Sequence, residues 1–346
     1  MRTFVKTTQD ASIYQRLPFD NSGLDEILEV GKWVKPTDAD KMYATGSVRT
    51  LLNFNLVSGS YTSSAQYYLN LHIADAKFVN RYQAIEICPI SRSWIEGSGY
   101  FYQDNRNVED GVTWEKATRL TSWSNAGSDF TTTTTASYTF SEVPISSNIR
   151  INVTNLIGPV IQGVNTTPWN GLIVKLPNVD EIDQSNKGNI KFFSGNTHTV
   201  YEPLLEVVWN DQVFITGSLK PIPNSNLSIV PKNIKQSYTS GEVDKIYLVV
   251  RDLYPDKRFD AVQRYRNMYY LPSQSYFRIR DVAADVELFR FDAYSAINCD
   301  ASGSYIILDT NGLNINRYYN IDLKIQSQNL VFFPEFNYTF KIDSNE

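Results

Sequence analysis

Carboxylates are the side chains in this sequence that come closest to a catalytic arrangement. Acidic residues adjoin at Glu109-Asp110 and at Asp180-Glu181, with Asp183 two positions further on. Such groups could bind calcium or serve as a general acid and base. Neither group has the spacing of a calcium-binding loop, and the two carboxylates of a glycoside hydrolase cannot be paired from sequence alone. We therefore interpret both groups as solvated loop residues.

Other reaction centres lack their necessary partners. His72 and His198 are the only histidines, and neither has a Cys or His neighbour with which to build a zinc site. No nucleophile motif supports a Ser-His-Asp triad. Gly97-Ser98-Gly99 is too short for a nucleotide cradle and has no strand–helix–strand context. The sequence therefore predicts a protein that is not an enzyme, with no catalytic residues, no metal and no cofactor.

Tryptophan is the residue type most suggestive of binding. Trp94, Trp114 and Trp123 fall within the stretch 93–130, beside Gly, Asn, Asp or Ser. Their rings could stack on sugars, or they could be buried indoles that pin a long connection bent by glycines. We favour packing, and such a connection needs a rigid sheet on either side of it.

Residues 252–272 interrupt the alternating pattern around them and form a long insertion, with a short helix suggested near 261–266. Arg and Tyr on long ordered loops are typical contact residues. Together with the Trp-rich stretch, the insertion supplies the candidate contacts to a glycan or a protein partner. These candidates are Tyr100, Tyr102, Trp123, Arg264, Tyr265 and Tyr269.

The elements that position these residues are strands. Aromatic residues make up 13% of the chain and charged residues only 20%, a composition that suits half-buried strands better than helices. Apolar and polar residues alternate with a period of two, the signature of a sheet with one wet face. Segments with this pattern include 49–56, 67–73, 83–88, 246–251, 276–280, 319–325 and 336–342.

At 346 residues the chain is long enough for two domains. All six Trp precede position 210, and a Pro-stiffened polar stretch follows. We predict an all-β chain: an N-terminal jelly-roll-type β-sandwich and then an immunoglobulin-like β-sandwich. The predicted parts are an extended arm at 1–22, with apolar residues that could dock on its own sheet or on a neighbouring subunit, the first sandwich at 23–210, a linker at 211–231, and the second sandwich at 232–346.

Charge and cysteine content exclude several partners. The net charge is −5 and no basic run occurs, which argues against nucleic acid. No apolar run approaches twenty residues and no secretory signal is recognisable, so neither a membrane span nor secretion is predicted. Cys88 and Cys299 are far apart in sequence, and we interpret them as free buried thiols.

The Trp-rich stretch resembles the DNRLRE domain, a β-sandwich related to some carbohydrate-binding modules. The resemblance covers roughly residues 10–210. It rests on Trp94-Ile95-Glu96-Gly97-Ser98-Gly99, on Gly111-Val112-Thr113-Trp114, on 123–129 and on the closing strand Glu202-Pro203-Leu204-Leu205-Glu206-Val207, preceded by matches at 21–31 and 49–56. Gly-Ser-Asp at 127–129 replaces the family's more usual Gly-Gly-Asp.

The segment 21–32 also looks like structural proteins from virions of tailed bacteriophages. This resemblance implies a non-enzymatic structural protein of the tail, neck, baseplate or capsid surface, folded in the host cytoplasm and then carried in the virion. Its partners would be other virion proteins, in a homo- or hetero-oligomer of a symmetric assembly. The alternative is a carbohydrate-binding or adhesion module that recognises host-surface glycans. The sequence leaves the alternative open.

Overall fold

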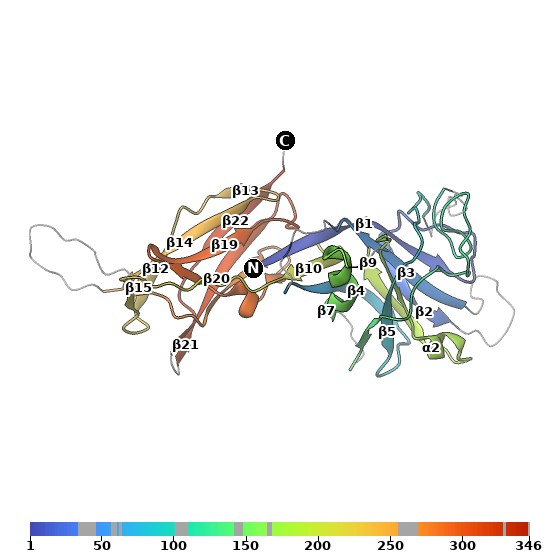
Figure 1. Cartoon of the computed structure of the whole chain (residues 1–346), viewed down its shortest axis with the longest axis horizontal. Helices are drawn as coiled ribbons and strands as arrows, with labels where there is room; N and C mark the ends of the chain where they lie inside the picture. The colour runs from blue at the N-terminus through green and yellow to red at the C-terminus, as the bar shows by residue number, and fades with distance from the viewer. Residues whose placement is uncertain are drawn as a thin grey trace, which may run out of the picture. The chain divides into compact units, whose positions relative to one another are not determined.

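The computed structural model describes residues 1–33, 46–56, 61, 64–100, 110–141, 148–164, 168–254, 269–327 and 330–344. The chain divides into two compact units. Val5–Val207 forms the N-terminal unit, and Met1–Phe4 together with Val208–Glu346 forms the C-terminal unit. Strands dominate both units, which confirms the predicted all-β sandwich class (Figure 1).

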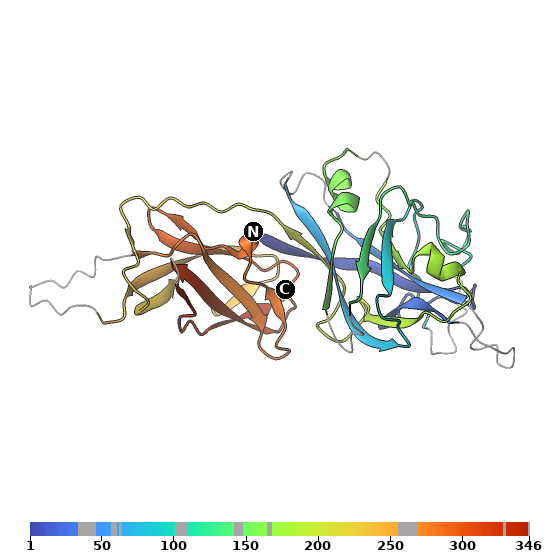
Figure 2. The same ribbon diagram turned by 90° about the horizontal axis from the view of Figure 1, so that it is seen from below.

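The strands and helices from the N-terminus to the end of the N-terminal unit are β1 (Arg2–Tyr14), β2 (Ile27–Trp33), β3 (Gly46–Phe54), β4 (Gln66–Lys77), β5 (Ala84–Pro89), β6 (Ala136–Thr139), β7 (Asn148–Asn152), α1 (Thr154–Ile161), β8 (Leu172–Lys175), α2 (Asn178–Ile182), β9 (Gly188–Phe193) and β10 (Leu204–Val208). Both helices are short and lie at the periphery of the strands (Figure 2).

The elements of the C-terminal unit are β11 (Lys220–Pro221), β12 (Leu227–Lys232), β13 (Ser237–Thr239), β14 (Val243–Asp252), β15 (Tyr269–Tyr270), β16 (Ser275–Asp281), β17 (Glu287–Phe289), the 3₁₀ helix η2 (Ala293–Ser295), β18 (Asn298–Asp300), β19 (Gly303–Asp309), β20 (Tyr318–Ser327), β21 (Leu330–Phe332) and β22 (Tyr338–Asp343).

The sheet of the N-terminal unit folds back on itself. Strand β1 pairs with both β10 and β3, which closes the path β1-β10-β4-β9-β2-β3, and β8, β5 and β6 continue from β3. The register shifts in β1 between Thr7 and Gln9 and in β4 between Ile73 and Asp75. Such bulges bend a strand, so that one strand can serve two layers of a sandwich.

Alternation along β4 predicted the buried face correctly but not the opposite one. Leu69, Leu71 and Ile73 are buried as expected, yet Asn70 and His72 are buried as well. The Asn70 amide donates a hydrogen bond to the Glu206 carboxylate at 3.2 Å, and His72 contacts the side chain of Asn148. Because these polar side chains find partners on β10 and at β7, the second face of β4 can also be covered.

The C-terminal unit contains a four-stranded sheet, β12-β14-β19-β18, and a sheet that follows the path β13-β22-β20-β16-β17, with β21 beside β20. The predicted alternation holds in both sheets. Ile246 and Leu248 of β14 are buried, as are Ile279 of β16 and Ile321 of β20. These side chains form the core of the second sandwich.

The N-terminal segment differs from the predicted arm at 1–22. Residues 2–14 form β1, and Ile13 and Tyr14 are fully buried. Met1–Phe4 folds with the C-terminal unit. There Phe4 packs on Phe289, with 5.8 Å between ring centroids, and Arg2 forms an ion pair with Asp292. The apolar residues of β1 are therefore used inside the chain itself.

The segment predicted as a linker at 211–231 also carries structure. Leu227 and Ile229 are buried where β12 pairs antiparallel with β14. Earlier in the segment, the Cys299 N–H donates to the Val213 carbonyl and the Ile215 N–H donates to the Cys299 carbonyl. The Pro and Asn residues of this segment led to the prediction of a linker. A short strand nevertheless forms there, because an edge strand such as β12 tolerates Pro.

Candidate binding site

The three tryptophans of the 93–130 stretch are core residues. Trp94, Trp114 and Trp123 are each at most 6% exposed and share a cluster with apolar side chains of β1, β3, β5 and β8. The Trp94 indole N–H donates to the Asn170 carbonyl at 2.8 Å, and that of Trp123 donates to the Thr113 carbonyl at 3.0 Å. Buried rings with satisfied N–H groups hold this connection in shape and present no platform to a ligand.

A second support of the connection is Asn21. Its amide nitrogen donates to the carbonyls of Glu96 and Val112, each at 2.7 Å, and its oxygen accepts from the Gly99 N–H at 2.7 Å. A Cβ on Gly97 would lie 2.6 Å from the Asn21 oxygen. The stretch needs glycine there because backbone and amide pack too closely for any side chain.

Of the two acidic groups considered for catalysis, the one at 180–183 is used in ion pairs. In the other group, Asp110 accepts hydrogen bonds from the Ser98 N–H and hydroxyl, and Glu109 lies outside the described residues. Glu181 accepts two hydrogen bonds from Arg49, at 2.9 and 2.7 Å, and the Arg49 guanidinium lies 4.8 Å from the Trp114 ring. Lys187 pairs with Asp180 and Asp183 at 3.0 and 2.6 Å, and this contact lowers the pKa of the Asp183 carboxyl. These carboxylates neutralise cations of the scaffold.

The described residues hold no group of three or more His, Cys, Asp or Glu side chains that could bind a metal ion. His72 is enclosed beside Asn148, whereas His198 is exposed and lies 3.5 Å from Glu26. The described helices include none with the length and hydropathy needed to cross a lipid bilayer.

Asp10 is a buried carboxyl outside these pairs. One of its oxygens accepts a hydrogen bond from the Gly195 N–H at 2.7 Å, and the other has no partner among the described residues. Burial, with further repulsion from Glu96 and Glu202, raises the pKa of Asp10 to about 7. The surroundings of Asp10 thus favour the neutral, protonated form of its side chain.

Three of the six predicted contact residues, Tyr100, Trp123 and Tyr269, are among the described residues. Trp123, proposed as a contact, is buried in the core, which corrects that assignment. Tyr269 is buried in the C-terminal unit, where its hydroxyl donates to Asp252 at 2.9 Å. Tyr100 is partly exposed in the N-terminal unit. Tyr102, Arg264 and Tyr265, with the helix suggested near 261–266, lie outside the described residues.

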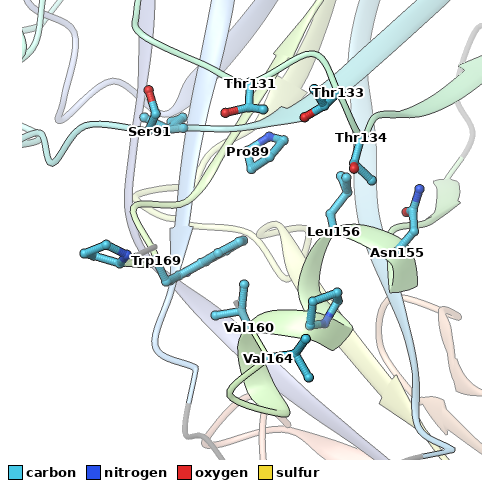
Figure 3. A pocket seen from close by; sticks show the side chains of 13 residues that line it. Pro89, Ser91, Thr131, Thr133, Thr134, Asn155, Leu156, Val160, Val164 and Trp169 are labelled. Atoms are coloured by element: carbon cyan, nitrogen blue, oxygen red, sulfur yellow. The ribbon is translucent and has the colours of Figure 1, made fainter. Parts of the chain in front are cut away.

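A pocket of about 440 Å³ lies in the N-terminal unit, beside a tryptophan that the sequence reasoning did not select. Figure 3 shows Thr131, Thr133 and Thr134 along one side and Trp169 with Val160 along the other. The Trp169 indole N–H donates to the Phe54 carbonyl at 3.1 Å, which fixes the half-buried ring. The volume falls in the range of roughly 300–1,000 Å³ typical of small-ligand sites.

The sequence did contain a signal for this pocket. Pro168-Trp169-Asn170-Gly171 has the composition of a turn, and the threonine run 131–135 leads into a β-branched and aromatic segment. A bulky aromatic residue in a turn is a candidate for exposure. Its partners at 89–91 and 154–164 are distant in the chain, so only the fold could bring them to it.

The comparisons with known proteins do not assign this chain to a family. No family model matches the chain, and no curated protein matches it significantly. Among solved structures, a DUF4785 family protein from Legionella pneumophila aligns over 96% of this chain with 8% identity and a TM-score of 0.19. A Parabacteroides merdae β-glucuronidase aligns over 96% with 7% identity and a TM-score of 0.20. The chain spans 64% and 35% of the lengths of these two proteins.

Proposed function

We propose that this chain is a non-enzymatic structural protein of a tailed-bacteriophage virion, a component of its tail, neck, baseplate or capsid surface. One observation carries the proposal. Within the described part of the 93–130 stretch, the Asn21 amide donates to the carbonyls of Glu96 and Val112, and the Arg49 guanidinium donates to that of Gly127. A long connection fixed in this way presents shape rather than reactive groups, which suits a building block of an assembly.

Contacts to other virion proteins would then fall on strand edges and exposed loops. Among the described residues, β6 ends the strand path of the N-terminal unit and β12 ends the four-stranded sheet of the C-terminal unit. An edge strand offers unpaired backbone groups to a neighbouring chain. Pro231 removes one donor from β12, which restricts the ways in which a partner strand could pair there.

Quantitative mass spectrometry of gradient-purified particles tests this proposal. We expect the chain at a constant ratio to the major capsid protein across independent preparations and after a high-salt wash. A host cytoplasmic protein of similar abundance in the lysate is the control, and its ratio should fall with each purification step. Loss of the chain in parallel with that control would refute a structural role.

The second candidate function is recognition of a host-surface glycan. Trp123 cannot provide its platform because the ring is buried. The pocket beside Trp169 is the observation that favours this candidate, since it joins a fixed aromatic ring to several hydroxyl groups.

A further inference from the structure

We propose that the pocket beside Trp169 binds a neutral oligosaccharide, whose ring face stacks on the indole while its hydroxyls bond to a wall of threonines. This inference rests on the second candidate function and assigns its site and ligand class. It is independent of incorporation into a virion.

The apolar side of the pocket is rigid before any ligand binds. The hydrogen bond from Trp169 to Phe54 fixes the indole. Gly171, two positions later, has φ +97 and packs so closely that a Cβ would lie 2.3 Å from the Leu52 carbonyl oxygen. Val160 of α1 lies on this side as well (Figure 3). A preformed aromatic surface binds the apolar face of a sugar at little entropic cost.

The opposite side supplies hydroxyl groups. Ser91, Thr131, Thr133 and Thr134 line the pocket, and none of these four hydroxyls has a hydrogen-bond partner among the described residues. The backbone beneath them is fixed, because the Ser91 N–H donates to the Asp129 carbonyl at 2.9 Å and the Thr131 N–H to the Pro89 carbonyl at 3.0 Å. Each hydroxyl can therefore donate to and accept from a ligand.

Asn155 adds an amide at the end of the hydroxyl wall. Its nitrogen donates to the Thr135 carbonyl at 3.1 Å, which orients the side chain from the first turn of α1. The amide oxygen has no partner among the described residues and can accept a bond from a ligand hydroxyl. A pyranose has an apolar ring face and hydroxyl groups around its edge. The apolar surface of the pocket can contact the ring face while the donors and acceptors around it bond to the hydroxyls.

The charge of the pocket selects the ligand class. Among the described residues that line it, none carries an ionised side chain. A sialylated, uronic or sulfated sugar would leave its anion without a cationic partner, at a desolvation cost. Neutral hexoses and their amide-bearing derivatives meet no such cost. We therefore expect neutral glycans to be preferred over otherwise identical acidic ones.

The test is an array of neutral oligosaccharides with their sialylated and sulfated counterparts, probed with the full chain and followed by calorimetric titration of the best neutral binder. The double variant Thr133→Val with Thr134→Val should weaken binding about tenfold, since two hydrogen bonds are lost. Trp169→Phe, which keeps a ring but loses indole area and its fixing bond, should weaken it about threefold to tenfold.

Thr132→Val is the matched control, because Thr132 is an exposed neighbour in the same loop that does not line the pocket. Its affinity should equal that of the unaltered chain. Saturable binding that is unchanged in the double variant would overturn the pocket assignment while leaving glycan recognition standing elsewhere. Absence of neutral-glycan binding, or a preference for acidic glycans, would overturn the inference together with the second candidate function.

Discussion

The side-chain oxygen of Asn21 accepts a hydrogen bond from the backbone N–H of Gly99 at 2.7 Å, although the two residues are 78 positions apart. The same amide donates to the carbonyls of Glu96 and Val112. One buried side chain thus stands in for a strand partner, and it ties two parts of the 93–130 stretch to the segment before β2. Buried backbone groups need such partners.

Asn21→Asp should destabilise the protein while keeping the shape of the side chain. A carboxylate cannot donate, so the Glu96 and Val112 carbonyls would face like-charged oxygens, at a cost of about 3 kcal/mol or more. Urea unfolding followed by fluorescence measures the change. Asn186→Asp is the control, because exposed Asn186 only accepts a bond, from the Gly188 N–H, and should change stability by less than about 0.5 kcal/mol. Equal stabilities of the two variants would contradict this role of Asn21.

Gly97→Ala and Gly163→Ala separate backbone strain from close packing. Both glycines have positive φ, +85 and +67, so alanine should cost each about 1–2 kcal/mol. A Cβ at Gly163 meets nothing within 4 Å, whereas one at Gly97 would clash with Asn21 and Gly111. Gly97→Ala should therefore lose considerably more stability than Gly163→Ala, as measured by thermal unfolding. Similar losses would show that the packing around Asn21 is looser than described.

Ser128→Gly should stabilise the chain. Ser128 has φ +91, a conformation that suits glycine, and its buried hydroxyl has no partner among the described residues. Removing the backbone strain and the unpartnered hydroxyl should raise the free energy of unfolding by about 1 kcal/mol, despite the greater freedom of glycine in the unfolded chain. Ser137→Gly, in strand β6, should have the opposite sign because glycine weakens a strand. A raised unfolding midpoint for the first variant and a lowered one for the second are the expected results.

Asp10→Asn should change how stability depends on pH. The folded-state pKa of Asp10 is raised to about 7 from an ordinary 3.8, so between these values the folded chain holds a proton that the unfolded chain has lost. Protonated Asp10 therefore contributes its full share to the free energy of unfolding below pH 3.8, and this contribution disappears as the pH rises through 7. The amide introduced by the substitution stays neutral at every pH, and its oxygen can still accept the hydrogen bond from the Gly195 N–H.

The variant should accordingly gain stability over the unaltered chain as the pH rises, by up to the order of 4 kcal/mol above pH 7. Comparing the two proteins at each pH cancels the other titrating groups. Denaturant midpoints at about pH 5 and pH 8 are sufficient. A difference that stays constant with pH would show that Asp10 is not titrating in this range.

Phe4→Ala should destabilise the C-terminal unit specifically. Phe4 is 3% exposed and packs on Phe289, and the Asn311 amide donates to its carbonyl at 3.0 Å. Removing the ring should cost about 3–5 kcal/mol. Hydrogen exchange in 208–344 should speed up while amides of β5 and β8 keep their protection. Phe78→Ala, at a ring 74% exposed, is the control and should leave both units unchanged.

The regular strands could be predicted from sequence because their cores follow a period of two. Segments 246–251, 276–280 and 319–325 lie within β14, β16 and β20. The prediction failed where pairing was decided by distant partners. The apolar residues of β1 are compatible with pairing in any sheet. That β1 pairs with β10 and β3 is decided by residues distant in the chain, so it could not be predicted from the sequence of β1. β12 was hidden by Pro231, which an edge strand tolerates.

The candidate site could be predicted only in part. Packing was favoured for Trp94, Trp114 and Trp123, and all three are buried. Trp123 nevertheless stayed among the contact candidates, because sequence cannot show that its N–H reaches the Thr113 carbonyl. Trp169 was passed over since its turn gave no sign of the threonines that lie opposite it across the pocket (Figure 3).

A particle map is the most direct test of the central claim, that this chain is a structural module assembled into a virion. Cryo-electron microscopy of particles from the phage that encodes it should show density that accepts each β-sandwich unit at symmetry-related positions of the tail, neck, baseplate or capsid surface. That density should vanish from particles made without the gene. A complete map with no position that fits either unit would contradict the account.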